Sequence, residues 1–179
     1  NKIEEEAERF VNIEKDVNSV EEAIAGAKDI IAEHISDEAD YRIRIRELTM
    51  KEGMITSTAK DKEAESVYEM YYEFAESIEK VAGHRILALN RGENEKILTV
   101  KVEAPQERIL MYLEKQVITK DNPNTKELLK EVIMDSYTRL IAPAIEREIR
   151  NELTERAEDG AIKVFGKNAK QLLLGAPLK

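Results

Sequence analysis

Two histidines and a few arginines are the side chains of this sequence whose types could do chemistry. His34 and His84 lie in separate parts of the chain, no cysteine accompanies them, and no His-Glu-x-x-His pattern occurs. The usual spacings of zinc ligands are therefore missing. The glycine-rich signatures of phosphate loops and dinucleotide sites and the Gly-x-Ser-x-Gly of hydrolases are missing as well. We expect no metal, no cofactor and no enzyme activity, and a surface or packing role for each histidine.

Arginines form two short groups that could contact phosphate. Arg42 and Arg46 share a face if they lie on a helix, because they are four residues apart. Arg85 and Arg91 belong to a stretch, "GHRILALNRGENEKILTV", that also contains His84. These five residues are our candidates for a structural or interaction role. Since acidic residues outnumber basic ones by 37 to 28, ion pairs within the protein are favoured over phosphate contacts.

The composition limits the class of protein and its partners. A net charge of −9 opposes binding to nucleic acid or to an anionic membrane, because both depend on lysine and arginine. We therefore expect weak or no nucleic-acid binding by this chain and no membrane association. The absence of cysteine fits a reducing cytoplasm. The first residue, Asn1, is not methionine, and we expect the chain to be a piece of a longer protein.

The elements that position these residues are expected to be mostly helices. Charged residues make up 36% of the chain and glycine and proline are few, a balance typical of helical proteins. Ser19 and Glu22 form a capping box at the start of one helix. A second helix is expected over 36–53, although "RIRIRE" within it alternates as a strand would.

Two short strands are expected among the helices. Residues 54–58 are rich in β-branched side chains and unsuited to a helix, and residues 97–103 alternate in the manner of a half-buried strand. We expect them to pair as a two-stranded element. Between them we predict a helix over 62–81, whose apolar residues recur at helical spacing, and a short helix over 84–93 that closes at Arg91-Gly92.

The last third of the sequence predicts a long helix. Pro143 cannot lie inside a regular helix because it lacks an amide hydrogen and clashes with the preceding turn. We therefore expect a break near Ala142 and a new helix from Pro143 to about Leu174. Its apolar residues repeat every four positions, which advances the stripe by about 40° at each step: Ile145, Ile149, Leu153, Ala157, Ala161, Phe165, Ala169 and Leu173. Such a stripe meets different neighbours at the two ends of the helix.

Four stretches resemble the Tex family of bacterial transcription accessory proteins. They are "SVEEAIAGAKDIIAEHISDEADYRIRIRE", "GHRILALNRGENEKILTVKV", "DSYTRLIAPAIEREIRNELTERAEDGAIKVFGKN" and "LLLGAPL", and they follow the order found in the family. The family usually has Pro-Ser before His-Arg, where this chain has Ala82-Gly83. The resemblance implies a fragment of the N-terminal helical region that precedes an RNase-H-like domain, helix-hairpin-helix modules and an S1 domain.

We therefore predict a mainly α, elongated segment with a small two-stranded β element. Residues 1–142 would form a helical subdomain and residues 143–174 a long connecting helix. By resemblance, its partners are the rest of its own chain and RNA polymerase or a ribonucleoprotein, and its function is that of a scaffold in a cytoplasmic transcription factor. The alternative is an independent helical protein–protein interaction module without a transcription role.

Overall fold

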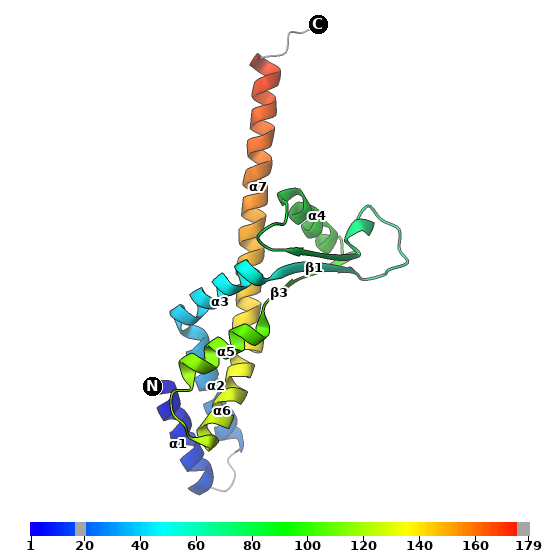
Figure 1. Cartoon of the computed structure of the whole chain (residues 1–179). Coiled ribbons are helices and arrows are strands. Elements are labelled where there is room, and N and C mark those ends of the chain that lie inside the picture. The colour runs from blue at the N-terminus through cyan, green and yellow to red at the C-terminus, as the bar shows by residue number, and fades with distance from the viewer. Residues whose placement is uncertain (17–20, 175–179) are drawn as a thin grey trace. The chain divides into compact units, whose positions relative to one another are not determined.

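The structure is a computed structural model that describes residues 1–16 and 21–174. The chain is mainly α-helical, with a small antiparallel sheet and a long C-terminal helix (Figure 1), as the sequence predicted. It divides into two compact units, each built from two separate stretches. The first unit contains residues 1–49 and 105–145, and the second contains residues 50–104 and 146–179. The predicted division at residues 142 and 143 stays a prediction.

The first unit is a packed group of helices. It contains α1 (Lys2–Asp16), α2 (Glu21–Asp37), α5 (Gln106–Val117), α6 (Pro123–Asp135) and most of α3 (Ala39–Glu52). Helix α1 packs on α2 and α6, and α6 also contacts α5. Its core consists of fully buried aliphatic side chains at helical spacing: Ile31, Ile35, Ile45, Ile109, Leu113, Leu129, Ile133 and Ile141.

Several helix ends of the first unit differ from the sequence expectation. The capping box at Ser19 lies outside the described residues. Ser36 belongs to the last turn of α2, where its hydroxyl donates to the Glu33 carbonyl at 2.9 Å; α3 begins later, at Ala39. The "RIRIRE" stretch is helical, as predicted, because a helix turns Ile45 into the core and leaves Ile43 57% exposed.

The predicted break before Pro143 is a change of helix type and not an interruption. A π-helical segment, η2 (Ser136–Ile141), joins α6 directly to α7 (Ala142–Leu174). Its wider turn lets the Ala142 amide donate to the carbonyl of Tyr137. One regular hydrogen bond is absent at Pro143 in any case, since proline has no amide hydrogen, and the helical backbone continues through the π segment into α7.

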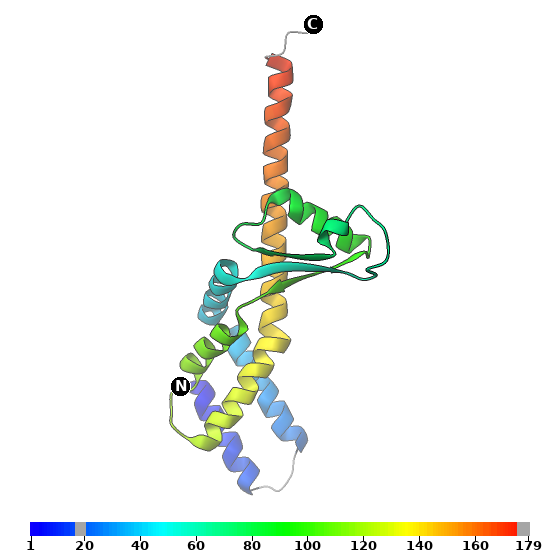
Figure 2. The ribbon, with the colours of Figure 1, turned by 45° about the vertical axis from the view of Figure 1, so that its right-hand side comes forward.

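The second unit contains an antiparallel sheet in the order β2-β1-β3. Its strands are β1 (Met54–Ala59), β2 (Glu73–Ser77) and β3 (Leu98–Glu103), and Thr56 in the centre lies opposite Ala75 and Lys101. Helix α4 (Gly83–Asn94) lies against β3 on one face of the sheet (Figure 2). The pairing of the two predicted strands is confirmed, but the sheet has three strands and not two.

The third strand replaces part of the helix predicted over 62–81. That region is a loop, a short 3₁₀ turn, η1 (Glu69–Tyr71), and strand β2. Of the apolar residues expected on its inner face, Tyr71 is buried but Val67 is 89% exposed and Met70 is 65% exposed. Glutamate-rich composition favours a helix locally, but pairing with the free edge of β1 overrides that preference.

The predicted long helix is confirmed as α7, which has 33 residues. The side chains of Ile149, Leu153 and Ala157 are at most 6% exposed, so the stripe is buried in the first half of the helix. In the second half it is open: Phe165 is 74% exposed and Leu173 is 85% exposed. Among the described residues, no helix combines the length and apolar character that crossing a membrane requires.

Candidate functional site

Helix α4 carries three of the five candidate residues, His84, Arg85 and Arg91. It begins at Gly83 without a side-chain cap. A Cβ atom at Gly83 would lie 3.2 Å from the Cα atom of Ala157 in α7. The glycine therefore suits the close approach of the two helices. The candidate site begins where α4 and α7 meet in this way.

A network of polar side chains joins the C-terminal half of α4 to α7. The guanidinium of Arg150 donates to Asn90 Oδ1 at 2.9 Å and to Glu93 Oε1 at 2.8 Å. Asn90 in turn donates through Nδ2 to Thr154 Oγ1 at 2.9 Å. The Arg150 side chain is only 16% exposed, so its ion pair with Glu93 is better shielded from solvent than a surface pair.

Sequence reasoning missed these four residues. The available signal was spacing: Asn90 and Glu93 are three apart and Arg150 and Thr154 are four apart, so each pair lies on one helix face. Nothing in the sequence showed that the two faces meet.

The three candidate residues of α4 differ in their environments. Arg85 reaches the sheet, where its guanidinium lies 4.0 Å from Glu76 Oε2 and 5.7 Å from the ring centre of Phe74. His84 and Arg91 are exposed. The predicted closure at Gly92 is wrong, because α4 continues to Asn94 and then ends with Lys96 in the left-handed region at φ 62°.

A groove of about 600 Å³ lies between the start of α4 and the second half of α7. Its wall is mainly apolar, and His84, Arg156 and Asn168 supply polar groups. The apolar residues that line it are Leu87, Ala157, Ala161, Val164 and Phe165. A concave apolar wall with a few polar groups can bind another apolar surface, and it holds no paired acid and base for catalysis.

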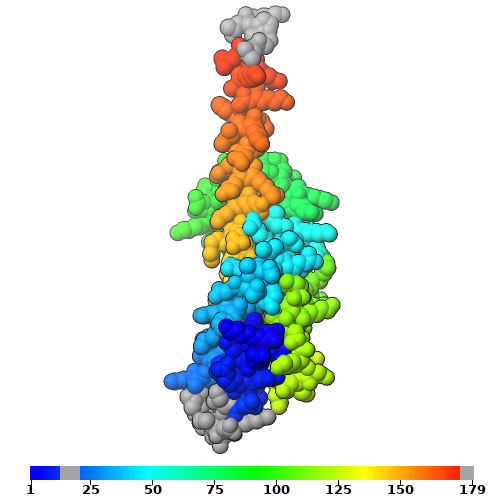
Figure 3. Space-filling view, turned by 90° about the vertical axis from the view of Figure 1, so that its left-hand side faces the viewer, coloured from blue at the N-terminus to red at the C-terminus, as the bar shows by residue number. Residues whose placement is uncertain are grey.

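The second half of α7, part of which lines this groove, is both apolar and basic. Its exposed large apolar residues are Ile162, Val164, Phe165, Leu172 and Leu173. From Gly160 to Lys179 the sequence contains lysine but neither aspartate nor glutamate. In the space-filling view this end of α7, orange to red, stands without another described segment beside it on the face shown (Figure 3).

The other two candidates, Arg42 and Arg46, belong to the first unit. Both are half-buried on α3, and each interacts with a neighbouring group. They therefore belong to a different compact unit from the arginines of α4. The structure also places His34 of α2 beside α1, with Nδ1 3.1 Å from Glu6 Oε2.

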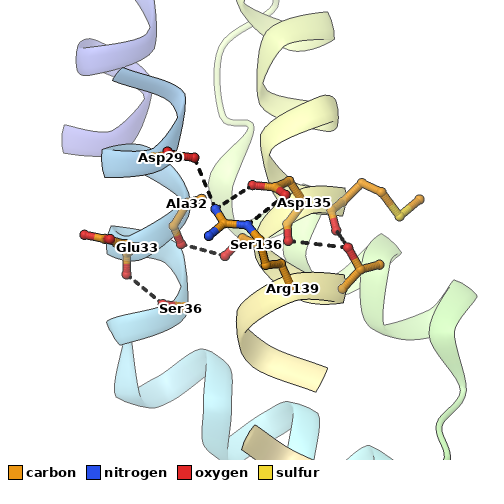
Figure 4. Close-up of polar contacts among 9 residues, drawn as sticks. Asp29, Ala32, Glu33, Ser36, Asp135, Ser136 and Arg139 are labelled. Carbon is orange, nitrogen blue, oxygen red and sulfur yellow. Dashed lines mark hydrogen bonds and ion pairs between the residues drawn. The ribbon is translucent and has the colours of Figure 1, made fainter. Parts of the chain in front are cut away.

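A second polar cluster, which sequence reasoning missed, joins α2 to the π segment (Figure 4). Arg139 binds both carboxylate oxygens of Asp135, at 3.1 and 2.9 Å, and reaches Asp29 of α2 at 3.2 Å. The hydrogen bonds from Arg139 hold the pKa of Asp135 below its ordinary value. Beneath them, the buried Ser136 hydroxyl donates to the Ala32 carbonyl at 2.6 Å. The contacts of this cluster hold α2 and the π segment together.

Within residues 1–16 and 21–174, no three histidine, aspartate or glutamate side chains are arranged to hold a metal ion.

Comparison with known proteins gives the family context. The family described as Tex central region-like matches residues 1–165. The Bacillus subtilis protein YdcI is 52% identical over 176 residues, which is 97% of this chain and 24% of that protein. The human S1 RNA-binding domain-containing protein 1 is 32% identical and covers 92% of this chain and 18% of its own length. The transcriptional accessory protein Tex of Neisseria gonorrhoeae is 28% identical over 98% of this chain and 24% of its own. This chain thus spans about a quarter or less of these relatives.

Proposed function

The chain belongs to the Tex family, and from this premise we propose that it is the helical scaffold portion of a nucleic-acid-associated transcription accessory factor. Relatives named for transcription and for an S1 RNA-binding domain support this role. In the proposal, this portion positions the other domains of a longer protein in the cytoplasm and has no enzyme activity of its own. RNA polymerase or a ribonucleoprotein is the proposed external partner.

One observation supports the scaffold role most directly: the polar side chains of the α4 site bind other elements of the fold. Arg150 holds Asn90 and Glu93, and Arg85 holds Glu76 and the ring of Phe74. Guanidinium groups engaged in this way are not arranged as a phosphate-binding surface, which needs cations directed to solvent. The net charge of −9 further disfavours contact with nucleic acid.

The test is a retardation assay at about 150 mM salt with single-stranded RNA and duplex DNA. We expect the 179-residue chain to leave both probes unshifted, while the full-length protein shifts at least one of them. Tight binding by the 179-residue chain would overturn the scaffold role. In that event a variant with Arg42→Gln and Arg46→Gln identifies the half-buried arginines of α3 as the contact, with Arg91→Gln as the matched exposed control.

The interaction-module alternative makes a different prediction for the same assay. If this portion acts without a transcription role, the full-length protein also leaves both probes unshifted. The result therefore separates the two functions without any assumption about the protein partner.

A further inference from the structure

The β1–β2 loop, residues 60–72, presents two large apolar side chains to solvent. Val67 is 89% exposed and Met70 is 65% exposed. The loop ends in the 3₁₀ turn η1, where the Tyr71 amide donates to the Tyr68 carbonyl at 2.8 Å. Burial follows the three-residue period of such a turn: Tyr68 and Tyr71 are buried, and the residue before each of them is exposed. In Figure 1 the loop extends past the end of β1.

Hydrogen bonds within the second unit hold the β1–β2 loop in this conformation. The Tyr68 hydroxyl donates to the carboxylate of Glu95 at the end of α4, and the Tyr68 amide donates to the Ser66 hydroxyl at 3.1 Å. The buried Ser57 hydroxyl of β1 donates to the Tyr71 carbonyl at 2.6 Å. The two buried tyrosines therefore tie the loop to α4 and to the sheet.

An ordered loop with exposed apolar side chains favours a protein-binding surface. Such side chains are common at interaction sites, and methionine is enriched there. Because the loop is already held in place, a partner that covers it does not have to order its backbone. With 89% of its surface exposed, Val67 projects from the loop and fits a concave apolar surface on the partner.

Charge indicates what kind of partner fits the β1–β2 loop. Residues 61–73 contain five acidic side chains and one lysine. Glu65 and Glu69, on either side of the first apolar side chain, are exposed. Within the described part of the chain neither forms an ion pair, whereas Glu73 is paired with Lys62 at 3.5 Å. These two carboxylates complement lysine or arginine at the edge of a partner surface, and they repel the phosphates of nucleic acid.

We propose that the β1–β2 loop docks on another protein that presents a concave apolar surface rimmed by lysine or arginine. Val67 and Met70 enter the apolar part of that surface, and Glu65 and Glu69 pair with the cations at its rim. The proposal goes beyond the scaffold function, because a loop of this kind serves a transcription factor and an independent interaction module equally well.

Photo-cross-linking in living cells identifies what covers the loop. The full-length protein carries the photoreactive residue benzoylphenylalanine in place of Val67 or, as the matched control, in place of Glu79, which is exposed outside the loop. We expect an adduct with another protein at position 67 and not at position 79. The cross-linked peptide of that protein, read by mass spectrometry, should contain large apolar residues with lysine or arginine beside them.

Titration of the full-length protein with the purified cross-linked partner tests the apolar contact. Val67→Ser with Met70→Ser should weaken binding at least about tenfold, because both side chains are expected at the centre of the interface. Met111→Ser, on α5 and 58% exposed, is the matched control and should change the affinity by under about twofold.

Charge reversal tests the basic rim in the same titration. Glu65→Lys with Glu69→Lys should weaken binding at least about tenfold, because like charges then face each other across the interface. Glu79→Lys with Glu103→Lys makes the same change in net charge at exposed positions outside the loop. That control should change the affinity by under about threefold.

Each other outcome overturns a defined part of the proposal. No adduct at position 67, or an equal adduct at position 79, would overturn docking at the loop. An adduct with the protein's own sequence, within one molecule or between two copies, would overturn a separate partner, and an adduct with RNA would overturn a protein partner. Binding that survives charge reversal would overturn the basic rim. None of these results changes the retardation assay, so the scaffold function stands or falls separately.

Discussion

The Glu4 carboxylate is buried within the first unit, where it joins α1 to the segment that follows α5. It accepts hydrogen bonds from the backbone amide and hydroxyl of Thr119 and from the amide of Lys120 at 2.5 Å. Burial acts to raise the pKa of Glu4, but these donors and the Lys120 charge outweigh it and leave the pKa below its ordinary value of 4.5. The ionised form is therefore the one that the fold stabilises.

Glu4→Gln should lower the free energy of unfolding by about 2 kcal/mol at neutral pH. The groups around residue 4 donate hydrogen bonds, and the NH2 group of glutamine is itself a donor, so some of these donors would lose their acceptor. The pH dependence has a defined sign. A carboxylate with a lowered pKa contributes stability above its unfolded value and loses it as pH falls through the folded one. The difference between wild type and variant should shrink below pH 4.5. Urea unfolding at several pH values measures it, with the exposed Glu5→Gln as control; a difference independent of pH contradicts the assignment.

Gly92 shows why a glycine in a helix cannot always be read as its end. A Cβ atom there would lie 2.8 Å from Leu98 Cγ and 3.3 Å from Tyr68 Cδ1. The sequence suggested a turn at Arg91-Gly92, but the left-handed residue is Lys96, and Gly92 serves close packing of α4 against β3. This depends on a contact between elements, which local sequence does not encode.

Gly92→Ala should destabilise the protein by about 1 to 3 kcal/mol, because the added methyl group overpacks a buried contact. Gly160→Ala is the matched control: it lies within α7 and has no neighbouring atom within 4 Å of the new Cβ. There the same change should stabilise by about 0.5 to 1 kcal/mol through helix propensity alone. Thermal melting compares the two, and a shift of the same sign in both would contradict the packing argument.

At the scale of elements, strong local signals predicted the structure and weak ones did not. The alternation of residues 97–103 and the long periodic stretch after Pro143 both became the expected elements. Residues 62–81 failed because their helical spacing is accidental, and pairing between β1 and β2 decides the outcome. The candidate site was recovered only in part: α4 was found, but its partner residues Arg150 and Thr154 depend on tertiary contact.

The two halves of α7 should respond oppositely to a charge placed on the same stripe. Leu153 is 6% exposed and Phe165 is 74% exposed. Leu153→Asp should cost about 3 to 5 kcal/mol, because it buries an unpaired charge. Phe165→Asp should cost under about 1 kcal/mol in the 179-residue chain. Urea unfolding of both variants measures this, and an unchanged midpoint for Leu153→Asp would mean that the first half of the stripe is not buried.

At the scale of the whole chain, the two compact units interleave along the sequence. The chain leaves the first unit after Thr49, returns to it at Pro105 and leaves again after Ile145. This arrangement could not be predicted from the sequence, because no glycine-rich or proline-rich linker separates the units. Helices α3 and α7 each contribute residues to both units, so the boundaries fall inside regular structure, where composition does not change.

This division predicts that a destabilising substitution in one unit affects mainly the amides of that unit. Hydrogen exchange measures this effect. Glu4 and its partners lie within the first unit, and Gly92, Leu98 and Tyr68 lie within the second. Glu4→Gln should speed exchange of the protected amides of α2 and α6 by about thirtyfold, the factor for about 2 kcal/mol. It should change those of β1 and β3 by under about threefold. Gly92→Ala should show the reverse pattern. Equal acceleration in both units by either substitution would mean that the chain opens as one cooperative body, and the proposed division would then have no energetic meaning.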